Sequence, residues 1–134
     1  MTDLIFQFPV RIYYEDTDAG GVVYHARYLH FFERARTEYL RTLDFSQQML
    51  LNERNVAFVV KTMTIDYRLP ARLDDWLVVE TKISEVRGAA ILFTQQLKRD
   101  ELILCTATVK VASVDLSKMK PVALPDEVKA AFLK

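Results

Sequence analysis

Between residues 13 and 36 the chain reads YYEDTDAGGVVYHARYLHFFERAR, an acidic loop that runs into a stretch with helical period. Glycine allows positive φ and close approach of another group, and the start of a helix offers unpaired N–H donors to negative charge. The loop therefore predicts a site of chemistry, with an acidic surface turn as the plainer alternative. Its chemical groups are three carboxylates (Glu15, Asp16 and Asp18), two adjacent glycines (Gly20 and Gly21) and one histidine (His25).

A helix is predicted over residues 26–43, directly after this loop. Its apolar side chains recur every three to four residues and form one stripe, opposite a polar face. Arg36 falls inside the stripe, and a buried guanidinium needs a partner because an unpaired charge is costly in a low-dielectric interior. Glu33 is one helical turn away, so we expect a Glu33–Arg36 pair that fixes the loop or a subunit contact; direct catalysis by Arg36 is the alternative. The stripe consists of Tyr28, Phe32, Ala35, Tyr39 and Leu43, flanked by Leu29, Phe31 and Leu40.

Strands are predicted on both sides of the helical region. Residues 6–14 alternate apolar and polar side chains and contain Pro9, which cannot donate to a ladder and indicates an edge strand. A short helix over 46–53, with Ser46 as its N-cap, precedes four consecutive strands. Four meandering antiparallel strands form a twisted sheet with one face to cover, and the long apolar helix is the obvious cover. The four strands span residues 56–69, 76–86, 90–98 and 102–114, and a further short helix is predicted at 126–133.

These elements predict a single α+β domain over residues 1–134, in which a curved antiparallel sheet wraps round one long helix. A sheet with open edges and one covering helix favours dimerisation through an edge or a helix face. Any pocket floor is expected to consist of apolar residues of the long helix and of the strand at 56–69, either within one chain or across a subunit boundary.

The composition argues against several classes of function. Lys plus Arg and Asp plus Glu number 18 each, so no net field draws the chain to nucleic acid or to a membrane surface. No stretch approaches the ~18 apolar residues of a membrane span. The first nine residues lack the features of a signal peptide, so we expect a cytoplasmic location. One cysteine, Cys105, and two histidines do not suit a zinc site of the usual kind; we expect no metal or cofactor, and Cys105 in the core.

Residues along the whole chain resemble one family. The run from Tyr14 to His25, with Tyr28 and the Glu33–Arg36 segment behind it, is similar to the signature of the hotdog-fold acyl-CoA thioesterases of the 4-hydroxybenzoyl-CoA thioesterase-like group. Within that group the chain resembles the YbgC type, which is encoded with the Tol–Pal envelope system of Gram-negative bacteria. The resemblance implies hydrolysis of acyl-CoA by a homodimer or homotetramer whose helix is enclosed by a curved antiparallel sheet. It extends to residues 45–48, 57–60, 70–75, 93–95 and 118–121.

The resemblance also implies roles for three residues. The essential aspartate of the family falls on Asp18, either as nucleophile or as the general base that activates water. The assisting histidine falls on His25 and a supporting tyrosine on Tyr14. Thioester hydrolysis needs a nucleophile or base, a donor for the developing oxyanion and exclusion of bulk water. We hypothesise that backbone N–H groups from Tyr24 to Ala26, at the start of the helix, supply that donor.

The other charged residues of the region receive plainer interpretations. Glu15 and Asp16 are interpreted as solvated or loop-shaping, and His30 as a surface residue of the helix. Coenzyme A carries phosphates, so basic side chains near the site should hold them. The candidates are Lys61, Arg68, Arg72, Arg87 and Lys98.

Two alternatives from other functional classes were weighed against the enzyme. A scaffold that holds an acyl thioester or an acyl carrier protein, linked to the envelope or phospholipid machinery, has no need of a carboxylate facing the thioester, so Asp18 and His25 favour the enzyme. A hotdog dehydratase uses a differently spaced histidine with an acid on the helix, which this loop does not resemble. The sequence leaves open the length of the acyl group and the choice between dimer and tetramer.

Overall fold

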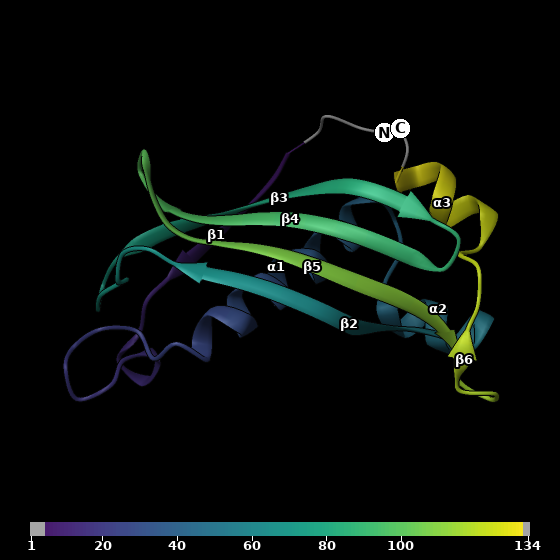
Figure 1. Ribbon diagram of the computed structural model, residues 1–134, viewed down its shortest axis with the longest axis horizontal. Helices are drawn as coiled ribbons and strands as arrows, with labels where there is room; N and C mark the ends of the chain where they lie inside the picture. The colour runs from purple at the N-terminus through teal and green to yellow at the C-terminus, as the bar shows by residue number, and fades with distance from the viewer. Residues whose placement is uncertain (1–4, 133–134) are drawn as a thin grey trace.

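A computed structural model of the protein describes residues 5–132 (Figure 1). The predicted strands and helices are all found there, with ends that shift by up to three residues; Leu133, the last predicted residue of the final helix, lies outside the described residues. The elements are β1 (Phe6–Arg11), η1 (Tyr14–Asp16), α1 (Arg27–Thr42), α2 (Gln47–Arg54), β2 (Val56–Tyr67), β3 (Trp76–Arg87), β4 (Ala90–Arg99), β5 (Leu102–Asp115), β6 (Lys120–Pro121) and α3 (Asp126–Phe132).

The strands form one antiparallel sheet in the order β1-β3-β4-β5-β2, and β6 pairs with β5. The predicted meander of four consecutive strands is wrong for β2, which pairs with β5 and not with β3. Short turns at 88–89 and 100–101 keep β3, β4 and β5 adjacent, whereas the connection at 68–75 is long enough to cross the end of the sheet. The edge position predicted for the strand with Pro9 is confirmed, because β1 pairs only with β3.

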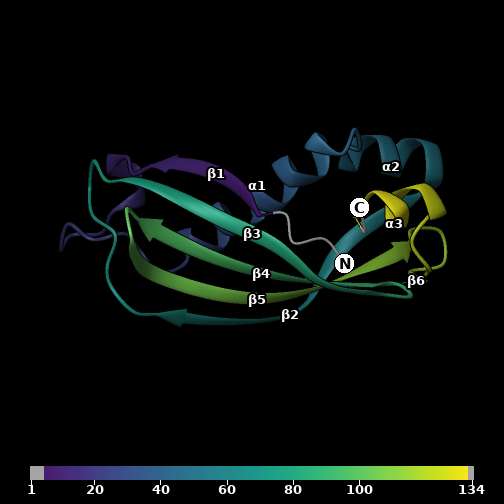
Figure 2. The same cartoon turned by 90° about the horizontal axis from the view of Figure 1, so that it is seen from above.

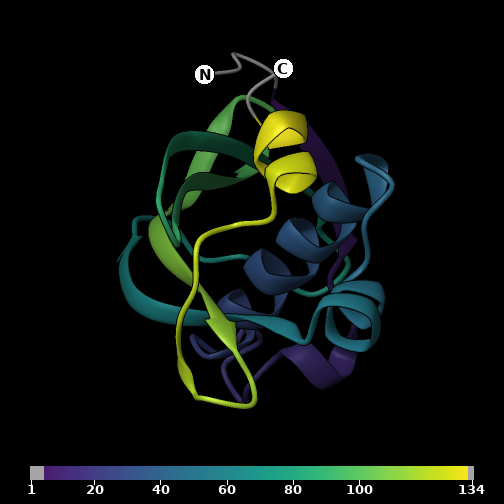
Figure 3. The same ribbon diagram turned by 90° about the vertical axis from the view of Figure 1, so that its right-hand side faces the viewer.

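Helix α1 lies in the hollow of the curved sheet, as its apolar stripe predicts (Figure 3). Fully burying one large apolar side chain stabilises a fold by roughly 1.5–3 kcal/mol, so the stripe contributes strongly to the core. Leu29, at the margin of the stripe, departs from the prediction because it is 41% exposed. The buried residues of α1 are Tyr28, Phe31, Phe32, Ala35, Tyr39 and Leu40.

The short helices and the acidic loop lie at opposite ends of the sheet. α2 and α3 stand at one end, and the loop before α1 stands at the other (Figures 1 and 2). Ser46 is the N-cap of α2 as predicted, since its Oγ accepts a hydrogen bond of 3.0 Å from the amide of Met49. Neither α2 nor α3 therefore covers the loop or the start of α1.

The single cysteine belongs to the core, as predicted. Cys105 is fully buried on β5, and burial raises the pKa of its thiol to about 12. Among residues 5–132, no helix combines the length and the apolar character that a membrane crossing requires.

Candidate active site

A tight turn presents Asp18 at the tip of the acidic loop. The amide of Gly21 donates to the Asp18 carbonyl at 3.1 Å, and the amide of Asp18 donates to the Val22 carbonyl at 2.9 Å. The Asp18 carboxylate accepts a hydrogen bond of 2.8 Å from the amide of Gly20, where a Cβ atom would approach its Oδ1 to 3.3 Å. Gly21 adopts a φ of +80°, which L side chains rarely adopt. Both glycines are therefore needed to hold an exposed carboxylate at this position.

Asp16 ties the two ends of the loop together. Its buried carboxylate accepts a hydrogen bond of 2.9 Å from the amide of Tyr13 and lies 3.8 Å from Nε of Arg27. Its carbonyl accepts a hydrogen bond of 3.0 Å from the amide of Tyr24. Arg27 also donates to the carbonyl of Glu15 at 3.3 Å, while the side chain of Glu15 is exposed. These contacts confirm the loop-shaping interpretation of Asp16 and the solvated one of Glu15.

His25 stands at the junction between the loop and α1. Helix α1 begins at Arg27 with Ala26 as its N-cap, so His25 precedes the helix by two residues. The imidazole is exposed, and its centroid lies 4.5 Å from the ring of Tyr24 and 6.4 Å from the ring of Tyr67. Tyr67 donates a hydrogen bond of 3.0 Å from its hydroxyl to the His25 carbonyl. The end of β2 is thus in direct contact with this junction.

Some of the backbone amides before α1 donate hydrogen bonds within the chain, and others have no acceptor among residues 5–132. The amide of Tyr24 is bonded to Asp16, so Tyr24 drops out of the predicted set of oxyanion donors. The amides of His25 and Ala26 have no acceptor among residues 5–132. Ala26 has no side chain that can cap the helix. Two N–H groups therefore stay available to a ligand at this junction.

The three predicted site residues all lie on this loop and are all exposed, Tyr14 by 81%. In the part of the chain that the structure describes, no hydrogen bond or ion pair joins any two of Asp18, His25 and Tyr14. The structure thus places them at one end of the sheet but does not bring their functional groups into contact.

The predicted Glu33–Arg36 pair is wrong. Arg36 donates to Oε1 of Gln95 at 3.0 Å, and no ion pair joins it to Glu33 in the described structure. Gln95 is fully buried, and its amide nitrogen donates to the carbonyl of Phe32 at 3.0 Å and to Oγ1 of Thr81 at 2.9 Å. Burial lowers the pKa of the Arg36 guanidinium, and the Glu33 carboxylate partly offsets this. Arg36 points towards β4 because the buried amide there supplies a fixed acceptor.

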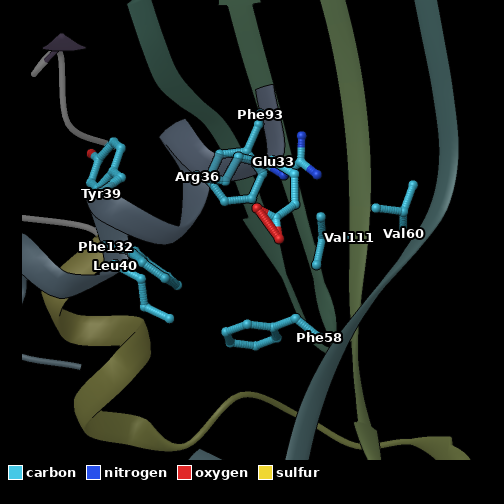
Figure 4. A pocket seen from close by; sticks show the side chains of 9 residues that line it. All are labelled: Glu33, Arg36, Tyr39, Leu40, Phe58, Val60, Phe93, Val111 and Phe132. Atoms are coloured by element: carbon cyan, nitrogen blue, oxygen red, sulfur yellow. The ribbon is translucent and has the colours of Figure 1, made fainter. Parts of the chain in front are cut away.

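A cavity of about 140 Å³ lies beside this cluster, between α1 and the inner face of the sheet (Figure 4). It is comparable to an engineered cavity of about 150 Å³ that binds benzene. Glu33 and Arg36 line one part of it. The other lining residues are Tyr39, Leu40, Phe58, Val60, Phe93, Val111 and Phe132.

The five candidate phosphate ligands differ in whether they form an ion pair with an Asp or Glu side chain. The side chains of Lys61 and Arg72 have no ionic partner in residues 5–132, and Arg72 forms a backbone bridge with Val22 of the site loop. In the same residues, no cluster of three or more His, Cys, Asp or Glu side chains suits a metal ion. The engaged candidates are Arg68 with Asp66, Arg87 with Glu85 and Lys98 with Glu80.

Two contact residues, Tyr67 and Gln95, are not among the site residues predicted from the sequence. Tyr67 is 42 residues from His25 along the chain, and nothing in its strand pattern indicates the contact. Gln95 did carry a signal, because it occupies an inward position of β4 between the buried Phe93 and Leu97. A polar residue in an apolar phase of a strand indicates a buried hydrogen-bond partner.

The chain is similar to known proteins over nearly its whole length. The model of a family described as the thioesterase-like superfamily matches residues 13–132. An acyl-CoA thioesterase YbgC of Haemophilus influenzae is 73% identical over 132 residues, which are 98% of this chain and 97% of that protein. An acyl-CoA thioester hydrolase YbgC of Escherichia coli is 56% identical over 133 residues, 98% of each chain.

Solved structures of thioesterases are also similar to this chain. A probable thioesterase from Bartonella henselae has a TM-score of 0.87 at 40% identity and covers 91% of this chain and 100% of its own. A 1,4-dihydroxy-2-naphthoyl-CoA thioesterase from Synechocystis has a TM-score of 0.90 at 23% identity, over 97% and 96% of the two chains, and shares the fold. The predicted α+β hotdog fold is confirmed. The chain belongs to the thioesterase-like superfamily and is a thioester hydrolase.

Proposed function

We propose that this protein hydrolyses acyl-CoA to a free acid and coenzyme A, and that Asp18 carries the reaction. The observation that carries the proposal is the state of the Asp18 carboxylate. It is exposed at the tip of a rigid turn and bonded to the amide of Gly20, and no basic side chain pairs with it among residues 5–132. The close relatives named acyl-CoA thioesterase support the choice of substrate.

The chemistry follows one of two routes. As general base, Asp18 takes a proton from water while the water oxygen adds to the carbonyl carbon, after which the C–S bond breaks and coenzyme A leaves as the thiolate. As nucleophile, the carboxylate adds to the carbonyl carbon itself, and the C–S bond breaks as coenzyme A leaves as the thiolate; water then hydrolyses the resulting anhydride to the free acid and the Asp18 carboxylate. In both routes the carbonyl oxygen gains negative charge, which the amides of His25 and Ala26 stabilise. The His25 imidazole assists, and Tyr14 supports the carboxylate.

The acyl group is bound in the cavity of Figure 4, and a second copy of the chain brings the two parts of the site together. Val60 of the cavity and Tyr67 beside His25 are seven residues apart on β2, about 23 Å in an extended strand. The loop that carries Asp18 is therefore too far from the cavity of the same chain for a short acyl group to reach from one to the other. The outer edge of β2 is unpaired among the described residues, and Val60 and Tyr67 are 51% and 44% exposed. Antiparallel pairing of two β2 edges about their midpoint brings the loop of one copy to the cavity of the other.

The test is thiol release from a panel of acyl-CoAs, from short aliphatic and aromatic to long-chain, by wild type, Asp18→Asn and Glu15→Gln. Asparagine keeps an oxygen for the Gly20 amide, so Asp18→Asn removes the charge and leaves the turn intact. We expect kcat to fall about 1,000-fold. Glu15→Gln removes the same charge from an exposed side chain three residues away and is expected to keep wild-type activity.

Undiminished hydrolysis by Asp18→Asn would show that the carboxylate is not the reacting group. Binding of acyl-CoA without release of thiol by the wild type would favour the scaffold that holds acyl thioesters. The cytoplasmic location, the link to the Tol–Pal system and an acyl carrier protein as partner stay predictions.

A further inference from the structure

Tyr67, the last residue of β2, links the sheet to the junction between the site loop and α1. Its hydroxyl donates to the carbonyl of His25 at 3.0 Å, and its ring meets the imidazole of His25 edge-on at 6.4 Å. The hydroxyl is a neutral donor at ordinary pH, since burial raises the pKa of Tyr67. The hydrogen bond fixes the backbone at His25, where the side chains of Tyr24 and His25 are both exposed.

Tyr67 is itself held firmly. Its ring packs edge-on against Tyr28, with centroids 5.1 Å apart and planes at 78°. Tyr28 is buried in the core, and its hydroxyl accepts a hydrogen bond of 3.1 Å from the amide of Ala71. The amide of Val23 in the site loop donates to the carbonyl of the same Ala71 at 2.9 Å. The Tyr67 hydroxyl therefore occupies a position set by the core, and it can transmit that position to His25.

The planarity of the peptide bond gives this contact a chemical consequence. The carbonyl of His25 and the amide of Ala26 belong to one rigid plane and point in opposite directions. A hydrogen bond that holds the carbonyl towards Tyr67 therefore aims the Ala26 N–H away from the sheet. The preceding plane is held in the same manner, because the Tyr24 carbonyl accepts a hydrogen bond of 2.9 Å from the amide of Arg27. Both unused donors of the junction, His25 N–H and Ala26 N–H, thus have fixed directions.

We propose that Tyr67 is a positioning residue of the thioesterase reaction: its hydroxyl holds the His25–Ala26 peptide so that the imidazole and the two free amides face the thioester carbonyl. This inference rests on the proposed function, since it takes His25 and these amides as the groups that act on the substrate. Donors aimed in advance at a developing oxyanion stabilise the transition state more than the ground state. The contribution of Tyr67 is therefore expected in kcat and not in KM.

The experiment compares Tyr67→Phe with wild type and with Tyr13→Phe. Phenylalanine keeps the ring that packs on Tyr28 and removes only the donor. Tyr13 is 61% exposed, and its hydroxyl has no partner within residues 5–132, so Tyr13→Phe controls for the loss of a tyrosine hydroxyl. We expect kcat of Tyr67→Phe to fall about tenfold with KM unchanged, because a loosened donor no longer meets the oxyanion. The unfolding temperature should stay that of the wild type, and the NMR order parameters of the His25 and Ala26 amides should fall, because these N–H groups lose their fixed direction.

A fall in kcat of less than threefold, or unchanged order parameters at both amides, overturns the positioning role. A fall in kcat matched by an equal loss in Tyr13→Phe overturns it as well. Failure of the proposed function looks different: Asp18→Asn then keeps its activity, whatever Tyr67→Phe does. The order parameters need no substrate, so they test the hydrogen bond separately from the reaction.

Discussion

The loop before α1 and the middle of α1 each hold a charged group, Asp18 and Arg36, and the two groups have opposite environments. In the loop, Asp18 stays in water and is held by a backbone amide of its own turn. In the middle, Arg36 is partly withdrawn from water and is held by the buried amide of Gln95. Water solvates an exposed charge, so the protein has only to fix its position through the backbone. A charge near the core has lost that water and needs buried hydrogen-bond partners in its place. Activity and stability should therefore respond to different substitutions in these two regions.

The largest effect on stability is expected from Gln95→Leu. This change leaves the Arg36 guanidinium, the Phe32 carbonyl and the Thr81 hydroxyl without their partner. We expect a loss of about 3 kcal/mol in the free energy of unfolding, measured by denaturant titration. Gln96→Leu is the matched control, because Gln96 points to the other face of β4 and lies outside this network. A loss below about 1 kcal/mol would mean that the network does not hold Arg36 in place.

Arg36→Met should destabilise less than Gln95→Leu, by about 1–2 kcal/mol in the same titration. The substitution leaves Oε1 of Gln95 without a donor, but it also removes a charge that burial disfavours. The two effects partly offset each other. If Arg36→Met were the more damaging change, the guanidinium and not the amide would be the centre of the cluster.

Asp16→Asn tests a carboxylate that belongs to the loop but is buried like a core residue. The amide side chain can still accept from the backbone of Tyr13, and it loses the charge that faces Arg27 at 3.8 Å. We expect a loss of about 1 kcal/mol in unfolding free energy, together with a lower kcat because the loop is less tightly closed. Thiol release and thermal unfolding would be measured on the same preparation, with Glu15→Gln beside it. A loss of stability with full activity would separate the closure of the loop from the chemistry at Asp18.

The last effect appears only above pH 9 and concerns Cys105, a titratable group used by neither region. Its pKa is raised by burial from an ordinary 9.0 to about 12 in the folded protein, so the folded state binds this proton more tightly than the unfolded state. The resulting stabilisation is complete below pH 9 and is lost as the pH rises from 9 to 12. Unfolding free energies of wild type and Cys105→Ala should therefore converge over that range. A constant difference between them up to pH 12 would contradict the protonated, buried thiol.

The local sequence pattern predicted those features that depend on a single helix or strand. The apolar stripe predicted which side of α1 is buried, although Leu29 at its margin is exposed. The side-chain type of Ser46 predicted the start of α2, since capping depends on residues a few positions apart. Pairings over long separations were the failures: β2 joins β5, and Arg36 turns to Gln95 and not to Glu33 one turn away.

Sequence alone was sufficient for the fold class, for the loop that carries Asp18, His25 and Tyr14, and for the family, because these depend on short-range spacing and on residue type. The tertiary structure decided that β2 pairs with β5 at the second edge of the sheet, what satisfies Arg36, and that Tyr67 touches His25. These outcomes depend on the position of a side chain 42 or 59 residues away, which is set by the packing of the sheet round α1 and by no local preference. A hydrogen bond requires its two atoms within about 3 Å, and only the folded chain defines such distances.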